Sequence, residues 1–219
     1  MKKLIIAICS IFMLTLTSAM SIEMRPAVGI SGNMGVYAAT GIEENYNEAG
    51  TAIDETTTEH GAFATEFGSI FVELGLTDVL SVGVDYVPHT IETPNNKSSG
   101  GNGSVENSVE AHFEDLTTVY AKINVPLGGT YLKLGYTQAD VISKETMSSG
   151  NSFGNDTTSG YTIGLGYNHE ISNGVSVRAE ITGSDFSDVK ANNGATNKVE
   201  VKVKDMIGAR GTVSLVKSF

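Results

Sequence analysis

The chain has 219 residues, of which 40% are hydrophobic and 18% are charged, and its formal net charge is −11. The charged fraction lies below the roughly 25% that is usual for soluble domains. The acidic excess argues against a general nucleic-acid binder, because a polyanion requires a basic surface.

The first segment is typical of a secretory signal peptide. "MKKLIIAICSIFMLTLTSAMS" has two lysines, then an apolar run, then small residues. The run is too short and too often interrupted by Ser and Thr for a transmembrane helix. Cys9 lies inside it, not at its end as in a lipoprotein. Cleavage is expected after Ala19 or Ser21. With the boundary at Ser21, residues 1–21 are removed and 22–219 remain as one cysteine-free domain with a net charge of −13.

The rest of the chain alternates with a period of two, which predicts β-strands. In "FGSIFVELGL", Ile70 and Val72 share an apolar face, and Glu73 lies on the opposite one. Eight segments show this pattern: "RPAVGISGNMGVYAAT", "FGSIFVELGL", "LSVGVDY", "TVYAKINV", "YLKLGYT", "YTIGLGYN", "VSVRAEIT" and the last run from Val199.

The connections between these segments alternate in length. Short turns are predicted at "TD", "PLGGT" and "EISNG". Long polar loops are predicted at "GIEENYNEAGTAIDETTTEH", "TPNNKSSGGNGSVENS", "SKETMSSGNSFGNDTTS" and "SDFSDVKANNGATNK". This predicts an all-β fold: an eight-stranded antiparallel up-and-down transmembrane β-barrel with short periplasmic turns and four long external loops.

Charged side chains lie on the polar face of the predicted strands. In a soluble β-sandwich, the alternative fold, they would be wet, but that fold leaves the alternation of loop lengths unexplained. In a barrel they must face the lumen, because lipid does not tolerate unpaired charge at depth. The predicted lumen charge network consists of Glu73, Asp85, Lys122, Lys133, Arg178, Glu180 and Arg210.

Four glycines share this inward parity and leave two alternatives open. They either leave a water path through the lumen or make room for larger lumen residues such as Arg178 and Tyr120. The glycines are Gly83, Gly135, Gly164 and Gly166.

The carboxyl-terminal run "GTVSLVKSF" resembles the last strand of bacterial outer-membrane β-barrels, which ends on an aromatic residue with apolar residues at alternate positions before it. Phe219, Leu215 and Val213 match this pattern, whereas Lys217 departs from it. "ELGLTDVLSVGVDY" resembles the opacity-type and related porin-like small barrels. The resemblance implies a Gram-negative outer-membrane protein whose terminal strand is an assembly signal, read by the β-barrel assembly machinery.

The sequence offers two sets of candidates for catalytic or metal-binding residues, and neither has the required arrangement. His169 and Ser172 with Glu180 invite a hydrolase interpretation, but the first two fall in a predicted periplasmic turn. His60, His89 and His112 lie near outer strand ends without ligand spacing of their own. We therefore assign no catalytic residue, no metal ligand and no cofactor.

The sequence predicts an integral outer-membrane barrel with a side-chain-filled, charge-paired lumen, which acts as a structural or surface-interaction protein and not as an enzyme. The alternative is a narrow porin for small solutes. Expected partners are outer-membrane lipid and lipopolysaccharide, periplasmic chaperones and the assembly machinery, but not nucleic acid. Neither the oligomeric state nor a surface ligand follows from the sequence.

Overall fold

The computed structural model describes residues 24–99, 106–146, 152–194 and 198–219, and its regular elements are β-strands. The predicted signal peptide, residues 1–21, lies outside the described residues. Across the described ranges, no helix is long and apolar enough to cross a membrane.

Within these ranges, eleven strands form one sheet. They are β1 (Arg25–Tyr46), β2 (Ile53–Gly75), β3 (Leu80–Tyr86), β4 (Ile91–Glu92), β5 (Asn96–Ser99), β6 (Glu106–Asn124), β7 (Thr130–Thr146), β8 (Asp156–Ser172), β9 (Val175–Phe186), β10 (Val189–Asn192) and β11 (Val199–Ser218).

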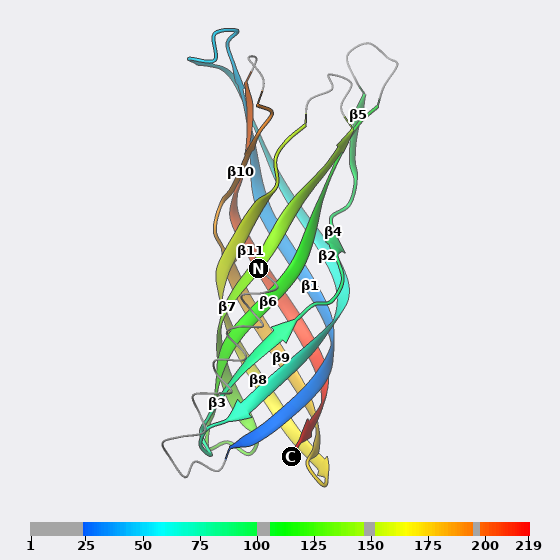
Figure 1. Ribbon diagram of the computed structural model, residues 1–219, viewed down its shortest axis with the longest axis vertical. Helices are drawn as coiled ribbons and strands as arrows, with labels where there is room; N and C mark the ends of the chain where they lie inside the picture. The colour runs from blue at the N-terminus through cyan, green and yellow to red at the C-terminus, as the bar shows by residue number, and fades with distance from the viewer. Residues whose placement is uncertain (1–23, 100–105, 147–151, 195–197) are drawn as a thin grey trace.

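Eight of these strands close into a ring. The neighbours run β1-β2-β3-β6-β7-β8-β9-β11, and β11 pairs back with β1, always antiparallel. The short strands continue the wall where a longer strand has ended. β4 and β5 pair with β6 beyond the end of β3, and β10 pairs with β11 beyond the end of β9. The prediction of an eight-stranded antiparallel barrel is confirmed (Figure 1).

Short turns gather at one end of the barrel, where the chain also ends (Figure 1). In the β8–β9 turn, Asn173 and Gly174 have φ values of 48° and 74°. Positive φ at both central residues is what a type I′ hairpin requires. Phe219 donates its backbone N–H to the carbonyl oxygen of Pro26, at 2.9 Å, so the last strand stays paired with the first to its end.

At the opposite end, the first of the four predicted long loops is shorter than expected. β1 runs to Tyr46 and β2 starts at Ile53, so only residues 47–52 connect them. A tilted strand needs about 9–11 residues to cross a membrane, whereas β1 has 22 and β2 has 23. The additional residues of β1 and β2 lie outside the lipid, where both faces of a strand contact water. The apolar–polar alternation that marks a strand is therefore lost there, although the backbone ladder continues.

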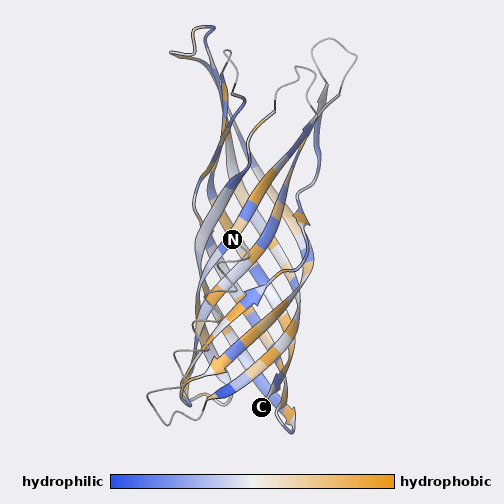
Figure 2. Ribbon diagram, in the orientation of Figure 1, coloured by the Kyte–Doolittle hydropathy of each residue, from blue (hydrophilic) through white to orange (hydrophobic). Residues whose placement is uncertain are grey.

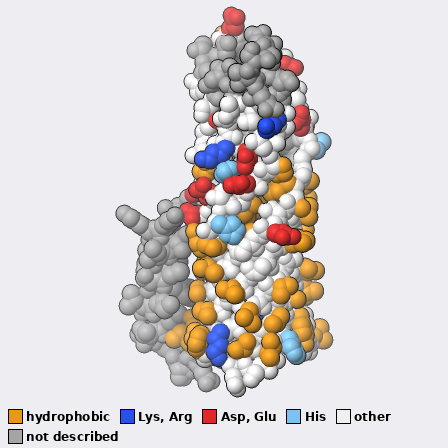
Figure 3. All heavy atoms as spheres, turned by 90° about the vertical axis from the view of Figure 1, so that its right-hand side faces the viewer, with side chains coloured by type: hydrophobic (Ala, Val, Ile, Leu, Met, Phe, Trp, Pro, Cys, Tyr) orange, Lys and Arg blue, Asp and Glu red, His pale blue; other side chains and the backbone are white. Residues whose placement is uncertain are grey.

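The burial pattern is the reverse of that of a soluble protein: many polar side chains are buried and many apolar ones exposed. Ile30 is 61% exposed, whereas its neighbour Ser31 is 8% exposed. Hydrophobic residues form a band around the wall, and charged residues gather above it (Figures 2 and 3). We call this band the lipid-facing belt; it includes Val28, Ile30, Met34, Val36, Ile70, Val72, Val119, Leu132, Leu134, Ile163, Leu165, Ile181, Val213 and Leu215.

A bulge in β6 reverses which parity faces inward. The register shifts between Glu114 and Thr117, and Asp115 in between has a φ of 52°. Below the bulge Tyr120 is buried in the lumen. Above it Phe113 packs inward against an apolar cluster of Phe67, Val87 and Ile91. Even-numbered residues of β6 therefore face outward above the bulge.

Candidate functional site

Five of the seven predicted lumen charges lie together inside the barrel. Their carboxylate and cationic groups interact through ion pairs, and the five residues are each less than 9% exposed. With two tyrosines they form what we call the charged layer: Glu73, Lys122, Lys133, Arg178, Glu180, Tyr120 and Tyr131.

Glu73 is the centre of this layer. Lys122 Nζ donates to its Oε1 at 2.5 Å, and the Arg178 guanidinium donates to both oxygens, at 2.7 and 3.0 Å. The hydroxyl of Tyr120 donates to Oε2 at 3.2 Å. Glu73 comes from β2 and Arg178 from β9, which are separated in the ring by β1 and β11. This bidentate pair therefore ties two non-adjacent strands together across the lumen.

Glu180 forms a second, smaller centre. Lys133 Nζ donates to its Oε1 at 2.9 Å, and the hydroxyl of Tyr131 donates to its Oε2 at 3.0 Å. Lys133 lies directly opposite Lys122 in the β6–β7 ladder. Like charges in that position repel, and the two lysines are accommodated because each binds a different glutamate.

The tyrosines also interleave with the lysines. Lys133 Nζ lies 4.3 Å from the centre of the Tyr120 ring, and Lys122 Nζ lies 5.4 Å from that of Tyr131. Each lysine therefore binds one glutamate and faces the ring of the tyrosine that binds the other. Such cation–π contacts gain strength when the groups are desolvated.

The other two predicted charges stand apart from these ion pairs. Asp85 is buried and accepts a hydrogen bond from Ser69 Oγ at 3.3 Å. Arg210 is half-buried, with its guanidinium carbon 6.0 Å from the ring centre of Phe67. The direct cross-strand partners of Arg210 are Gly35 and Thr182, and no ion pair joins Arg210 to another residue that the structure describes.

The inward glycines seat the two tyrosines. Gly83 lies opposite Tyr120, and Gly166 lies opposite Tyr131. A Cβ at either glycine would collide with the facing ring. Of the two alternatives left open by the sequence, the geometry favours room for larger lumen residues over a water path. Tyr131 is a lumen residue of the charged layer that the sequence analysis missed. Tyr131 is two residues from Lys133 and therefore shares its face of β7, which could have identified it as inward-facing.

Little space remains within the charged layer. The void among these side chains has a volume of about 10 Å³, which is about what a single water molecule needs. Hydroxyl groups further along the strands bind one another in chains, as in Thr118–Thr137–Thr162 at 2.8 and 3.0 Å. Further out along β2 and β6, the apolar cluster packs inside the barrel.

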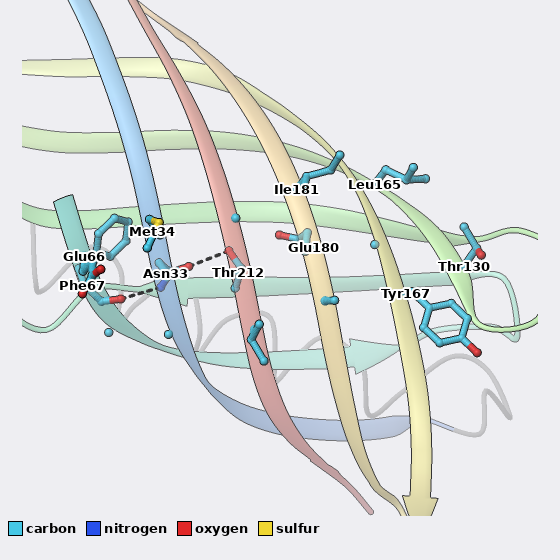
Figure 4. Close-up of a pocket in the computed structure, with 16 residues that line it drawn as sticks. Asn33, Met34, Glu66, Phe67, Thr130, Leu165, Tyr167, Glu180, Ile181 and Thr212 are labelled. Atoms are coloured by element: carbon cyan, nitrogen blue, oxygen red, sulfur yellow. Dashed lines mark hydrogen bonds between the residues drawn. The ribbon is translucent and has the colours of Figure 1, made fainter. Parts of the chain in front are cut away.

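A larger groove, of about 960 Å³, lies on the outer wall and not in the lumen (Figure 4). Gly32, Gly68 and Gly211 are exposed there and leave gaps between lipid-facing side chains such as Met34 and Ile181. Because the groove lies within the lipid-facing belt, acyl chains can fill it, and it offers no path for a solute.

Ion pairs also lie on the outer extensions of β1 and β11, and the pair between Lys202 and Glu44 joins the two strands. Lys202 Nζ lies 2.6 Å from Glu44 Oε1, and Lys198 Nζ lies 2.8 Å from Glu200 Oε2. The hydrogen bond from Lys198 lowers the pKa of the Glu200 carboxyl, and the hydrogen bond to Glu44 raises the pKa of the Lys202 amine.

The candidate catalytic residues do not converge. His169 and Ser172 are exposed beside the β8–β9 turn, whereas Glu180 is buried and bound to Lys133. The three outer histidines do not form one group either. His60 Nδ1 is hydrogen-bonded to Thr40 Oγ1 at 3.1 Å, and His112 Nε2 to Glu110 Oε1 at 3.0 Å.

A closed antiparallel ring with an apolar exterior and a polar, charge-paired interior defines a transmembrane β-barrel. A family model described as "Outer membrane protein beta-barrel domain" matches residues 95–204. The chain belongs to this family, and it is a protein of the bacterial outer membrane.

A solved structure agrees on the fold. The chain is similar to the outer membrane protein OprG from Pseudomonas aeruginosa, with a TM-score of 0.57 and 14% identity over 88% of this chain and 95% of that one. Weaker likenesses are to the outer membrane protein AlkL (TM-score 0.45, 11% identity, 87% and 90% covered) and to Ail of Yersinia pestis (0.39, 10%, 87% and 99%). No curated protein matches the chain.

Proposed function

We propose that this barrel is closed to solutes and serves as a structural and surface-interaction protein of the outer membrane, without enzymatic activity. The observation that carries the proposal is the charged layer, in which two glutamates, two lysines and an arginine are mutually paired around a void of about 10 Å³. A hydrated ion cannot pass such a layer unless the pairs separate, and each separation leaves charge unpaired in a nearly dry interior.

The outer extensions support the surface role. β1 and β2 carry an ion-paired, polar hairpin well beyond the lipid-facing belt. Such a hairpin can contact lipopolysaccharide or another surface, while the closed barrel anchors it. The alternative, a narrow porin, requires a path that the charged layer interrupts.

The conductance of the refolded, tag-free protein in a planar lipid bilayer tests the closed lumen. We expect no steady conductance at voltages where a general porin, measured in the same bilayers, conducts. Rare current spikes that lack a reproducible unit size fit the proposal. A steady unit conductance that scales with salt concentration would replace it with the narrow porin.

The terminal strand carries a second prediction. We propose that Phe219, with Leu215 and Val213, is the signal read by the assembly machinery. The Phe219 ring is 72% exposed and contributes little to packing. Deleting Phe219 should therefore reduce the amount of barrel in the outer membrane of cells several-fold, while barrel refolded in vitro keeps its stability.

Leu127 provides the control for this experiment. It is a similarly exposed apolar residue, in the β6–β7 turn, and is 71% exposed. Leu127→Ser should leave the amount in the membrane unchanged, so a general loss of exposed apolar surface is separated from loss of the signal. Equal amounts of the Phe219 deletion and the unmodified chain would show that the ending is not read.

A further inference from the structure

The outer part of β4 and β6 brings two carboxylates and one imidazole together. One ligand atom from each of Glu92, Glu110 and His112 lies within 4.8 Å of the other two. Glu110 and His112 are two residues apart on β6, and Glu92 is the direct cross-strand partner of His112. Residues two apart share a face of a strand, and direct partners adjoin on it, so the three side chains converge.

The three side chains point away from the lumen. Ile91 and Phe113, which are also direct partners, turn inward into and against the apolar cluster. Their chain neighbours Glu92 and His112 therefore face outward. Figure 3 shows acidic and histidine side chains together above the lipid-facing belt on the face that carries β2 and β4. His112 lies beyond the about 9–11 residues, counted from Asn124, that β6 needs to cross lipid.

Backbone contacts hold the short strand β4 in place. Thr93 donates its N–H to Ala111 O at 3.0 Å, and Ala111 donates its N–H to Thr93 Oγ1 at 2.9 Å. Ile91, 5% exposed, anchors the segment from inside. The three side chains therefore project from a fixed piece of sheet, not from a loop, and rigid placement of ligands is what a metal site requires.

We propose that Glu92, Glu110 and His112 form a binding site for a divalent transition cation of the zinc class. One imidazole nitrogen with carboxylate oxygens is a ligand set that zinc accepts, and three protein ligands leave a fourth position for water. Calcium and magnesium prefer sites made wholly of oxygen ligands.

The charges around the site suit a cation. Two carboxylates lie close together on one face, and their mutual repulsion is relieved by a bound dication. His112 Nε2 already lies 3.0 Å from Glu110 Oε1, with their side chains 18% and 21% exposed, so the pair is partly shielded from solvent. Lys144 is the direct cross-strand partner of Glu110 and is exposed, so its long side chain can swing into solvent when the metal binds.

A cation here would fasten β4 to β6. That pairing spans only two residues, Ile91 and Glu92, at the place where β3 has ended and the outer wall continues through short strands. The metal would therefore stabilise the rim of the barrel, and the residues following β4 should become more resistant to proteolysis.

Isothermal titration calorimetry of chelator-treated, tag-free, refolded barrel with zinc chloride tests the site. We expect one Zn²⁺ per chain, with no comparable heat from calcium or magnesium chloride. His112→Ala and Glu92→Gln should each weaken Zn²⁺ binding by about 100-fold or more, since they remove direct ligands. His60→Ala, which removes an outer histidine bonded to Thr40, should leave the affinity unchanged.

A cobalt titration provides a second readout. Co²⁺ in place of zinc should give a visible absorption band that His112→Ala abolishes and His60→Ala preserves. Heat-dependent gel mobility shows that each variant is folded before titration. Absence of stoichiometric binding, equal binding of calcium, or Zn²⁺ affinity that is insensitive to both His112→Ala and Glu92→Gln would overturn the assignment.

Discussion

Replacing Glu73 by glutamine is expected to lower the free energy of unfolding by about 3–5 kcal/mol, the cost of breaking a buried ion pair by removing one partner. The substitution keeps the shape of the side chain but leaves Lys122 and Arg178, both buried, without their shared counter-charge. It also weakens the cross-lumen tie between β2 and β9. Urea unfolding of the barrel in phospholipid vesicles, followed by circular dichroism, measures the loss.

Two comparisons make this result specific. Asp78→Asn removes an ion pair with Arg25 of 2.6 Å, but its side chain is 92% exposed, so we expect a loss below about 1 kcal/mol. Glu180→Gln deprives only Lys133 of its ion-pair partner and should fall between the two. If Glu73→Gln costs no more than Asp78→Asn, the charged layer does not hold the barrel together.

Removing Arg178, a cation that Glu73→Gln leaves unpaired, should restore part of the lost stability. In Glu73→Gln, the further change Arg178→Met removes the cation that had bound both Glu73 oxygens, and methionine is a long, unbranched side chain that fills part of the same space. The double variant should be more stable than Glu73→Gln alone, because it leaves one buried cation, Lys122, without a counter-charge instead of two. A double variant that is less stable than Glu73→Gln would indicate that Arg178 acts through its other contact, with Asn168, at 3.0 Å.

The sequence predicts the wall of the barrel well because lipid on one side and a narrow lumen on the other impose a strict alternation. Ile30 and Ser31, for example, differ in exposure as their parity requires. The outer halves of β1 and β2 were not predicted as strands, because lipid does not contact them there. Water on both faces removes the pattern, and residues such as Thr57 and Glu59 read as loop although they continue the ladder.

The lumen is predictable as a set of residues but not as a set of pairs. Parity identifies Glu73 and Arg178 as inward, yet nothing in the sequence says that they meet across the barrel from β2 and β9. That contact depends on the stagger between strands, which fixes the heights at which side chains face one another. The same stagger, combined with a bulge at Asp115, carries His112 to the outside beside two glutamates.

Enlarging Gly166 is the second change for which we expect a large effect. Gly166→Val would force the Tyr131 ring out of its seat and break the hydrogen bond of 3.0 Å from its hydroxyl to Glu180. Overpacking and the loss of a hydrogen bond to a charged group together should cost about 2–4 kcal/mol. The same urea titration measures the change.

Gly211 is the matched control, because it is a strand glycine of the opposite parity with open space where a Cβ would stand. Gly211→Val should be neutral or slightly stabilising, since a side chain is added on the lipid face without a clash. Tyr131→Ala in the Gly166→Val background should recover part of the lost stability by removing the ring that the valine displaces. If Gly166→Val and Gly211→Val change the free energy of unfolding equally, Gly166 is not needed to make room for the Tyr131 ring. The close packing of glycine against tyrosine would then no longer support a filled lumen.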